Sequence, residues 1–302
     1  MYDSTPAFAL AERVGPLPRA TPVASGDLGV RRRRSWAWAR TPSAVVGIAL
    51  TAVVLALAAL ADVLAPGDPF APVGPALSAP SSVHLIGTDD LGRDLLSGVI
   101  HGIRTSVFVA LGVGLIALPL GVVVGAVAGA RGGVVDDVLM RLSEVWQVLP
   151  RFFLALMVVA LFGPGLDRIV LVLGLTSWAL LARLMRAGIL SIREREFVEA
   201  ARALGMSEAR IVRRHMLPHV MPAAIVFVAL LLAQVCLVES SLGFLGLSDP
   251  NAISLGYLAA QAQRFLRVAW WMWFFPGVAL ITIVIGFNLV GDAINDRMRR
   301  RL

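Results

Sequence analysis

The chain has 302 residues, of which 58% are hydrophobic and only 16% are charged, and its mean hydropathy is +0.79. A soluble domain does not need this much apolar content, so the composition argues for several membrane spans. The 27 basic residues are all arginines and the net charge is +7, so their position along the chain is informative. The single cysteine, Cys236, excludes an internal disulfide, and no Cys/His cluster has the spacing of a zinc site.

The N-terminal region, residues 1–42, is polar, rich in Pro, Gly and Arg, and shows no hydrophobic periodicity, which predicts a mostly disordered tail. The tail ends in RRRRSWAWAR, directly before an apolar run, and this order resembles a signal peptide. The run at 43–65 is nevertheless long enough to cross a bilayer. We therefore predict an uncleaved first span, with Trp36 and Trp38 at the lipid headgroups.

Five further apolar segments follow, and together they predict an all-α polytopic membrane protein with six transmembrane helices. The third segment is interrupted by three charged residues, Arg141, Glu144 and Arg151. The predicted spans are 43–65, 105–129, 138–162, 167–187, 221–247 and 271–291.

The arginines are distributed unevenly between the two sides that these spans create. Most of them lie in the tail, in the 130–141 loop, in the 183–214 segment and in the basic C-terminus, 297–302. Because arginine is enriched in cytoplasmic loops, this bias predicts that both termini are cytoplasmic.

An external stretch between the first two spans ends in SVHLIGTDDLGRDLLSGVIHGIRTS. From Asp94 onward its apolar residues recur at helical spacing, so we expect a helix that lies on or enters the outer surface. Those apolar residues are Leu95, Leu96, Val99, Ile100 and Ile103. Three carboxylates in six residues, near His84, raise the possibility of a metal site, but we expect none.

A cytoplasmic segment, 192–218, predicts a pair of helices joined by a turn. Phe197, Ala200, Ala201 and Leu204 share one face of the first helix, which Gly205 is expected to end. In the second helix, Ser207 can act as the N-cap and Glu208 favours the first turn. Two prolines, Pro218 and Pro222, are expected to end this helix before the fifth span.

Three interpretations of this helix pair compete on physical grounds. It can lie on the inner membrane surface with its arginines near anionic lipid. It can be a DNA-binding helix-turn-helix, but such a motif needs a third packing helix, and membrane spans adjoin it on both sides. It can also be an amphipathic element that docks into a groove of a cytoplasmic partner.

The order of residues in this segment resembles the EAA loop of the membrane subunits of binding-protein-dependent ABC importers. Glu199, Ala200 and Ala201 are followed at the family's spacing by Gly205 and then by Leu217-Pro218. The family has isoleucine two residues before the Leu-Pro pair, and this chain has His215 there.

The external stretch is similar to one permease of the dipeptide, oligopeptide and nickel importer family, the subunit with a TDxxGRD segment after its first span. ESSLGFLGL at 239–247 and the segment 270–296 also resemble that family. The resemblance covers about residues 43–296 and leaves out the tail. It implies a type I ABC importer permease fold and a bacterial plasma (inner) membrane location, and it excludes a nucleic-acid partner.

This resemblance also implies a mechanism. The chain has no GxxxxGK[ST] phosphate loop, so no cofactor is expected in it, and ATP and Mg are expected in two separate ATPase subunits or domains. The helix pair would seat in a groove of one ATPase, with Glu199 at the joint, Ala200 and Ala201 allowing close approach, and Gly205 making the turn. Leu217 and Pro218 would join this lever to the fifth span. An extracytoplasmic binding protein and a second, homologous permease complete the expected complex.

Two groups of charged residues are candidates for further roles. Glu239 lies within a predicted span and could line the translocation path, or it could make a structural hydrogen bond to Gln234 or to a neighbouring helix. Four residues of the external stretch could shape its helix or contact the partner permease or binding protein. These four residues are Asp89, Asp90, Arg93 and Asp94.

The leading hypothesis is therefore a non-catalytic permease of a peptide importer. Nickel, glutathione or haem are alternative cargoes within the same family. A self-contained channel or secondary carrier is the alternative from another class, but such proteins often contain internal repeats, and none is clear here. For a membrane enzyme, no nucleophile, base and orienting group can be placed together.

Overall fold

The computed structural model describes residues 42–148 and 150–299, and it is helical over most of this range. The predicted tail, apart from Pro42, and residues 300–302 lie outside the described residues. The helices are α1 (Pro42–Ala59), α2 (Ala61–Leu64), α3 (Leu95–Arg131), α4 (Gly133–Val148), α5 (Arg151–Phe162), α6 (Leu166–Arg193), α7 (Glu196–Ala203), α8 (Glu208–Ile211), the π-helical turn η3 (Val212–Met216), α9 (Leu217–Phe244), α10 (Leu255–Ala262), the 3-10 turn η4 (Gln263–Phe265) and α11 (Trp271–Arg299).

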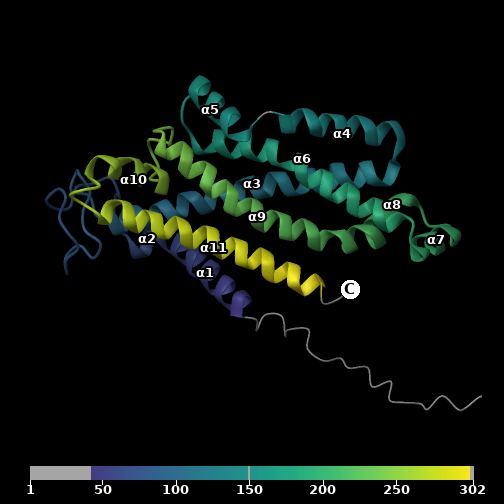
Figure 1. Ribbon diagram of the computed structural model, residues 1–302, viewed down its shortest axis with the longest axis horizontal. Helices are drawn as coiled ribbons and strands as arrows, with labels where there is room; N and C mark the ends of the chain where they lie inside the picture. The colour runs from purple at the N-terminus through teal and green to yellow at the C-terminus, as the bar shows by residue number, and fades with distance from the viewer. Residues whose placement is uncertain (1–41, 149, 300–302) are drawn as a thin grey trace, which may run out of the picture. The chain divides into compact units, whose positions relative to one another are not determined.

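Five helices of the described chain are long and apolar enough to cross a membrane: α1, α3, α6, the helix that runs from α8 through α9, and α11. A sixth crossing is provided only if α4 and α5 together form one span. The loops at 66–94 and 245–270 lie at one end of these helices, and α7 and α8 lie at the other end (Figure 1). The arginine-rich segments 130–141 and 183–214 are therefore on the same side.

The predicted span 138–162 is not a single straight helix. It is divided between α4 and α5, whose directions differ by 71°. Pro150 precedes α5 in an extended conformation, with φ −60° and ψ 119°. Proline has no N–H to donate to the preceding turn and disfavours helical backbone in the residue before it, which accounts for the break.

The predicted external helix is also not separate from the second span. Helix α3 begins at Leu95 and continues without interruption to Arg131, so the surface helix and the span are one element. Asp94 is its N-cap, and the Ser97 N–H donates to Asp94 Oδ2 at 2.9 Å. This cap supplies an acceptor for a backbone group that the first helical turn leaves unpaired.

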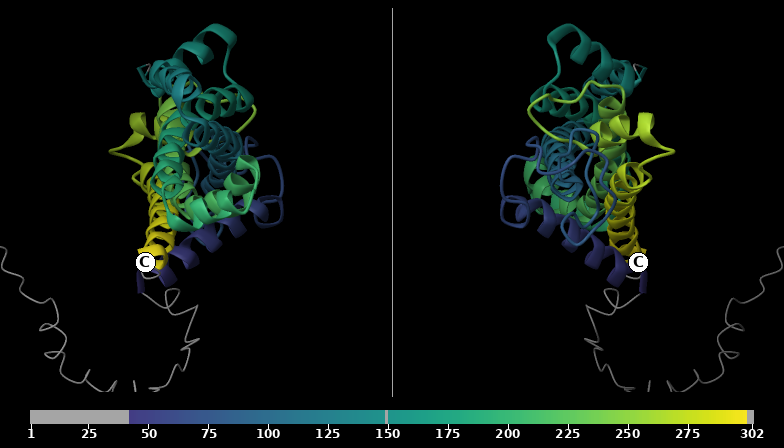
Figure 2. Two further views of the ribbon diagram at one scale, coloured as in Figure 1. Left: turned by 90° about the vertical axis from the view of Figure 1, so that its right-hand side faces the viewer. Right: turned by 90° about the vertical axis from the view of Figure 1, so that its left-hand side faces the viewer.

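Helix α3 packs against α1, α6, α9 and α11 in the bundle (Figure 2). Its contact with α6 depends on glycines one helical turn apart, Gly121, Gly125 and Gly129. A Cβ atom at Gly121 would lie 2.7 Å from Leu181 Cβ, and one at Gly129 would lie 2.9 Å from Ile189 Cβ. Glycines spaced in this way let two membrane helices approach closely, so this row fixes the position of α6, whose end leads into α7.

Candidate functional site

The coupling segment, defined here as residues 196–211, consists of α7, a tight turn and α8. Gly205 has φ +74°, a left-handed conformation that favours glycine. The Gly205 N–H donates to Arg202 O at 2.9 Å, and the Met206 N–H donates to Ala201 O at 3.2 Å. This pair of bonds is a Schellman motif, so the predicted role of Gly205 in ending the first helix agrees with the geometry.

One face of the coupling segment is packed onto the rest of the chain. Val198, Ala201 and Ile211 are buried, and they join a cluster that includes Ile189 of α6 and Met216 of η3. A salt bridge also joins the two short helices, because Arg202 Nε lies 2.7 Å from Glu208 Oε1. The segment is thus held to the ends of α6 and α9 by apolar contacts.

The opposite face of the coupling segment is open. Leu204 is 83% exposed and Phe197 is 37% exposed, and Glu199, Ala200 and Gly205 are also exposed. Of the four residues predicted to share the apolar face of α7, only Ala201 is buried. Val198 takes the inward position, because it belongs to the buried apolar cluster with Ile189 and Met216.

The second helix does not end at the two prolines. Helix α8 continues through η3 into α9, and Leu217 and Pro218 lie within this continuous helix. The Leu217 N–H donates to Val212 O, five residues earlier, so a π-helical turn directly precedes Pro218. Such a turn shifts the hydrogen-bond register next to the missing proline N–H, and membrane helices tolerate proline by local adjustments of this kind. Ser207 occupies the N-cap position but makes no side-chain cap bond.

His215, which stands where the family resemblance has isoleucine, is partly exposed in η3. Its carbonyl oxygen lies 2.6 Å from Nδ1 of His219, and the His219 ring stacks on Phe197 with 5.4 Å between ring centroids. These contacts join the start of α9 to α7. The sequence offered no reason to assign His215 or His219 to a binding site, and in the structure they make contacts within the chain.

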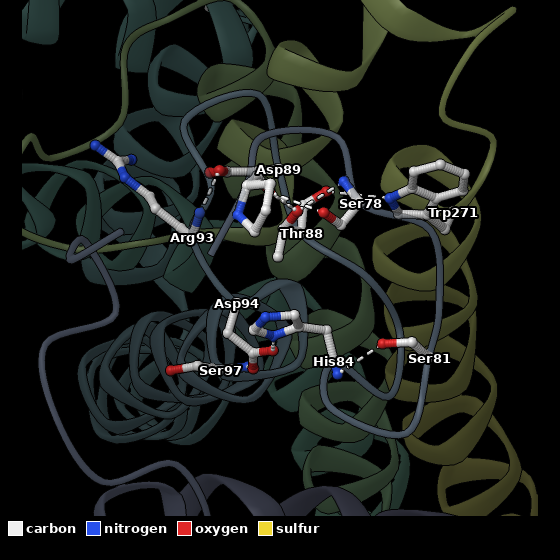
Figure 3. A network of polar contacts seen from close by, with 10 residues as sticks. Ser78, Ser81, His84, Thr88, Asp89, Arg93, Asp94, Ser97 and Trp271 are labelled. Carbon is white, nitrogen blue, oxygen red and sulfur yellow. Dashed lines mark hydrogen bonds and ion pairs between the residues drawn. The ribbon is translucent and has the colours of Figure 1, made fainter. Parts of the chain in front are cut away.

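At the other end of the helices, the external loop, residues 66–94, is fastened by polar contacts (Figure 3). Thr88 is fully buried; its Oγ1 accepts from the Ser78 N–H at 2.9 Å and donates to Pro75 O at 2.7 Å. The Trp271 Nε1–H of α11 donates to Thr88 O at 3.1 Å. The loop is therefore tied to the start of the last long helix.

Asp89 is 3% exposed and closes a turn in the external loop. Its Oδ1 accepts from the Leu91 N–H at 2.9 Å and from the Arg93 N–H at 2.8 Å. Burial raises the pKa of Asp89, although the two backbone hydrogen bonds act to lower it. Its carboxylate thus serves the fold of the loop.

The other three predicted residues of the external loop differ in their surroundings. Asp94 caps α3 and its Oδ1 lies 3.3 Å from His84 Nδ1. The Arg93 guanidinium lies over the Phe70 ring, 5.3 Å from its centroid, and Nη1 donates to Tyr257 Oη at 3.4 Å. Oδ1 of Asp90 is buried and has no hydrogen-bond partner among the described residues. The described part of the chain also contains no group of three or more His, Cys, Asp or Glu side chains arranged to hold a metal ion.

Glu239 of α9 is 2% exposed and lies against α3. Ser106 Oγ donates to Glu239 Oε2 at 2.9 Å, and Ser240 Oγ lies 3.4 Å from the same oxygen. This surrounding favours the structural alternative, although the partner is Ser106 and not Gln234. Ser240 and Ser241 line a neighbouring cavity of about 390 Å³ between α5, α9, α10 and α11.

Comparisons with known proteins show the family of the chain. Residues 121–302 match the family described as "Binding-protein-dependent transport system inner membrane component". The chain is 33% identical over 284 residues to a putative peptide transport system permease protein of Brucella suis, covering 93% of each chain. It is 36% identical over 225 residues to the dipeptide transport system permease protein DppC of Bacillus subtilis, covering 74% of this chain and 70% of that one.

The fold is similar to a solved structure as well. A chain of the MetNI methionine ABC transporter, in an inward-facing conformation, superposes with a TM-score of 0.56 at 18% identity. The match covers 67% of this chain and 97% of that chain. At this level of identity, the likeness concerns the fold.

Proposed function

We propose that this chain, which belongs to the family of inner membrane components of binding-protein-dependent transport systems and is a multi-pass permease subunit of an ABC importer, passes peptides across the membrane. Peptide cargo is supported by the relatives from Brucella suis and Bacillus subtilis, which are described as peptide and dipeptide permeases. Nickel, glutathione and haem are the competing cargoes.

The observation that carries the proposed mechanism is the two-sided character of the coupling segment. Its inner face is fixed to α6 and α9, while Phe197, Glu199, Ala200 and Leu204 are exposed. Leu204 is an exposed apolar residue at the end of a short helix whose other face packs onto the permease. Such a side chain can bind in a groove of another protein. We infer that this face seats in an ATPase subunit and that ATPase closure moves α6 and α9 through it.

The individual residues have distinct roles in this proposal. Glu199 offers a charge at the joint, and Ala200 allows close approach of the partner. Ala201 is buried, so its small size serves packing against the permease itself. Gly205 makes the turn, and Leu217 and Pro218 continue the lever into α9.

The complete importer would contain further subunits. We propose two ATPase subunits or domains, which bind ATP and Mg, a second homologous permease and an extracytoplasmic binding protein. Both termini would be cytoplasmic, with the external loop on the opposite side, and this chain would have no catalytic role. Within the external loop, the partly exposed Asp90 and Arg93 are the candidates for a partner contact, whereas the buried Asp89 serves the fold of the loop.

Gly205→Asp tests the coupling role, and the chain offers a matched control. Gly246 has φ +78° and ends α9 with the same two backbone bonds, and a Cβ atom at either glycine would have no atom of the described residues within 4 Å. Aspartate therefore imposes a similar backbone cost of about 1 kcal/mol at both sites. We expect Gly205→Asp to abolish uptake while ATP hydrolysis continues, and Gly246→Asp to retain uptake.

The measurement is affinity purification of the tagged chain from native membranes, with ATPase and uptake assays on each variant. Recovery of a second permease and ATPase polypeptides with the wild-type chain is the expected result. Full uptake by Gly205→Asp would contradict the coupling role, and a chain purified without any ATPase would contradict the assembly.

Cargo is tested separately by uptake of a labelled dipeptide in cells that lack other peptide importers. Competition by unlabelled dipeptides, and none by nickel, glutathione or haem, is expected. Uptake of nickel without uptake of dipeptide would leave the permease assignment intact and overturn the peptide cargo.

A further inference from the structure

A cavity of about 590 Å³ lies where α3, α6 and α8 meet, beside the coupling segment. It is formed by the last turns of α3, the final residue of α6, and the start of the helix that continues into α9. Its lining residues are Ala126, Val127, Ala130, Arg131, Arg193, Glu208, Ala209 and Val212.

The lining of this cavity, which we call the inner-end cavity, is divided by chemistry. Ala126, Val127 and Ala130 form an apolar wall on α3, and Val212 adds to it from η3. Two cationic side chains, Arg131 and Arg193, also line it, and they lie at the ends of two membrane-spanning helices. An apolar wall that ends in cations matches a molecule with an anionic head and an apolar body.

The two arginines come from distant parts of the sequence but converge at the end of α3. Arg193 Nη1 lies close to Gly132, the residue after Arg131. A Cβ atom at Gly132 would be 3.3 Å from this nitrogen. Among the described residues, neither guanidinium makes an ion pair with a carboxylate. Arg193 interacts with Glu208 only through longer-range Coulomb attraction, so both guanidiniums lack a direct carboxylate partner.

Among the described residues, Glu208 is the only carboxylate in the lining of the inner-end cavity, and it is already engaged. Glu208 Oε1 lies 2.7 Å from Arg202 Nε, and Glu208 Oε2 lies 3.4 Å from Arg202 Nη2. With Glu208 neutralised by Arg202, the cavity keeps the charge of Arg131 and Arg193. An anion is therefore the ligand that its electrostatics favour.

We propose that the inner-end cavity binds an anionic phospholipid of the cytoplasmic leaflet, an inference that rests on the proposed orientation of the chain. The phosphate would lie between Arg131 and Arg193, and the glycerol and upper acyl chains would lie along Ala126, Val127 and Ala130. Arginines at the cytoplasmic ends of spans lie at headgroup depth, where basic pockets between helices bind anionic lipid headgroups. A protein carboxylate would satisfy the arginines but would leave the apolar wall uncovered.

Such a lipid would join α3 to two elements of the proposed mechanism, α6 and the coupling segment. It would bridge the ends of α3 and α6 and contact α8 of the coupling segment. Anionic lipid would then hold the coupling segment at a fixed height relative to the bilayer, and its removal would weaken the link between ATP hydrolysis and uptake.

The test uses the full chain in its purified complex, reconstituted in equal parts of phosphatidylcholine and phosphatidylglycerol. Native mass spectrometry then measures how much of each lipid stays bound. We expect selective retention of phosphatidylglycerol, and we expect Arg131→Gln with Arg193→Gln to weaken this preference about thirtyfold, since each basic residue near an anionic headgroup contributes about 1 kcal/mol.

Two controls make the outcome specific. Arg264→Gln with Arg267→Gln removes two exposed arginines at the opposite end of the helices and is expected to leave lipid retention unchanged. Ala130→Leu keeps both cavity arginines but fills part of the cavity beside the apolar wall. It is expected to reduce phosphatidylglycerol retention.

Four results would overturn the proposal. These are equal retention of the two lipids by the wild type, unchanged retention in the Arg131/Arg193 variant, displacement of the lipid by free inorganic phosphate alone, and loss of the ATPase subunit with lipid retention unchanged. The last result would assign the arginines to a protein partner. Uptake and subunit assembly are scored separately, so a failure here leaves the permease function standing.

Discussion

The external loop and the coupling segment are two charged regions at opposite ends of the same helices, and they differ in what they present to other proteins. In the external loop, Asp89 and Asp94 accept hydrogen bonds from nearby backbone groups of their own chain. In the coupling segment, Glu199 and Leu204 are exposed and the inward contacts are apolar. A conspicuous motif can therefore stabilise a loop of its own chain or form a surface for a partner. The direction of its side chains distinguishes these two roles.

This difference has an energetic consequence that substitutions can measure. Residues whose groups are used within the chain should affect stability when they are removed. Residues that face outward should affect assembly and transport while stability stays unchanged. The predictions below run from the largest expected effect on stability to the smallest.

The largest effect is expected within the coupling segment, at its buried face. Ile211 is 0% exposed, and Ile211→Ala should destabilise the protein by about 3 kcal/mol through lost burial and the cavity left behind. The matched substitution on the open face, Leu204→Ala, should leave stability unchanged and reduce recovery of the ATPase subunit. Thermal unfolding of the purified chain and co-purification measure the two effects, and equal destabilisation by both would contradict the two-sided description.

A smaller loss is expected for Asp89 in the external loop. Asp89→Ala removes the acceptor of two backbone N–H groups and should cost about 2 kcal/mol. Asp89→Asn keeps an acceptor oxygen and avoids burying a charge, so it should be close to wild type. A thermal unfolding midpoint for Asp89→Ala as high as that for Asp89→Asn would show that the turn does not depend on this oxygen.

The smallest loss is expected at the helix cap. Asp94→Ala removes the acceptor for the Ser97 N–H and the contact with His84, and should cost about 1 kcal/mol. Hydrogen exchange at the first turn of α3 is the direct readout, with Asp94→Ser as the control that restores a capping oxygen. Unchanged protection in Asp94→Ala would indicate that the cap does not hold this helix end.

Local patterns predicted much of this structure because their causes are local. Apolar length identified the long helices, and Gly205 identified the turn of the coupling segment. The break before α5 was not predicted, because the apolar length of 138–162 indicated one span and Pro150, which lacks an N–H, interrupts it. The prolines at 218 and 222 were overestimated as helix ends, because a π-helical turn accommodates the first of them.

Contacts between distant residues left no comparable signal. Thr88 and Trp271, Arg93 and Tyr257, and Ser106 and Glu239 meet only after the helices pack. Similarly, the identity of Val198 as the inward residue of α7 depends on the buried apolar cluster that it joins with Ile189 and Met216. Such features are properties of the tertiary arrangement, so the candidate site was predicted by motif but its orientation was not.

The most direct test of the central claim is cysteine crosslinking from the open face of the coupling segment. The only native cysteine, Cys236, is buried, so Leu204→Cys introduces one accessible thiol, and Leu266→Cys, at an exposed position at the opposite end, is the control. In native membranes, with a reagent that reacts with a thiol at one end and is photoactivated at the other, Leu204→Cys should crosslink to an ATPase subunit and Leu266→Cys should not. Failure of Leu204→Cys to capture an ATPase, while the complex still purifies intact, would contradict the assignment of this face as the coupling surface.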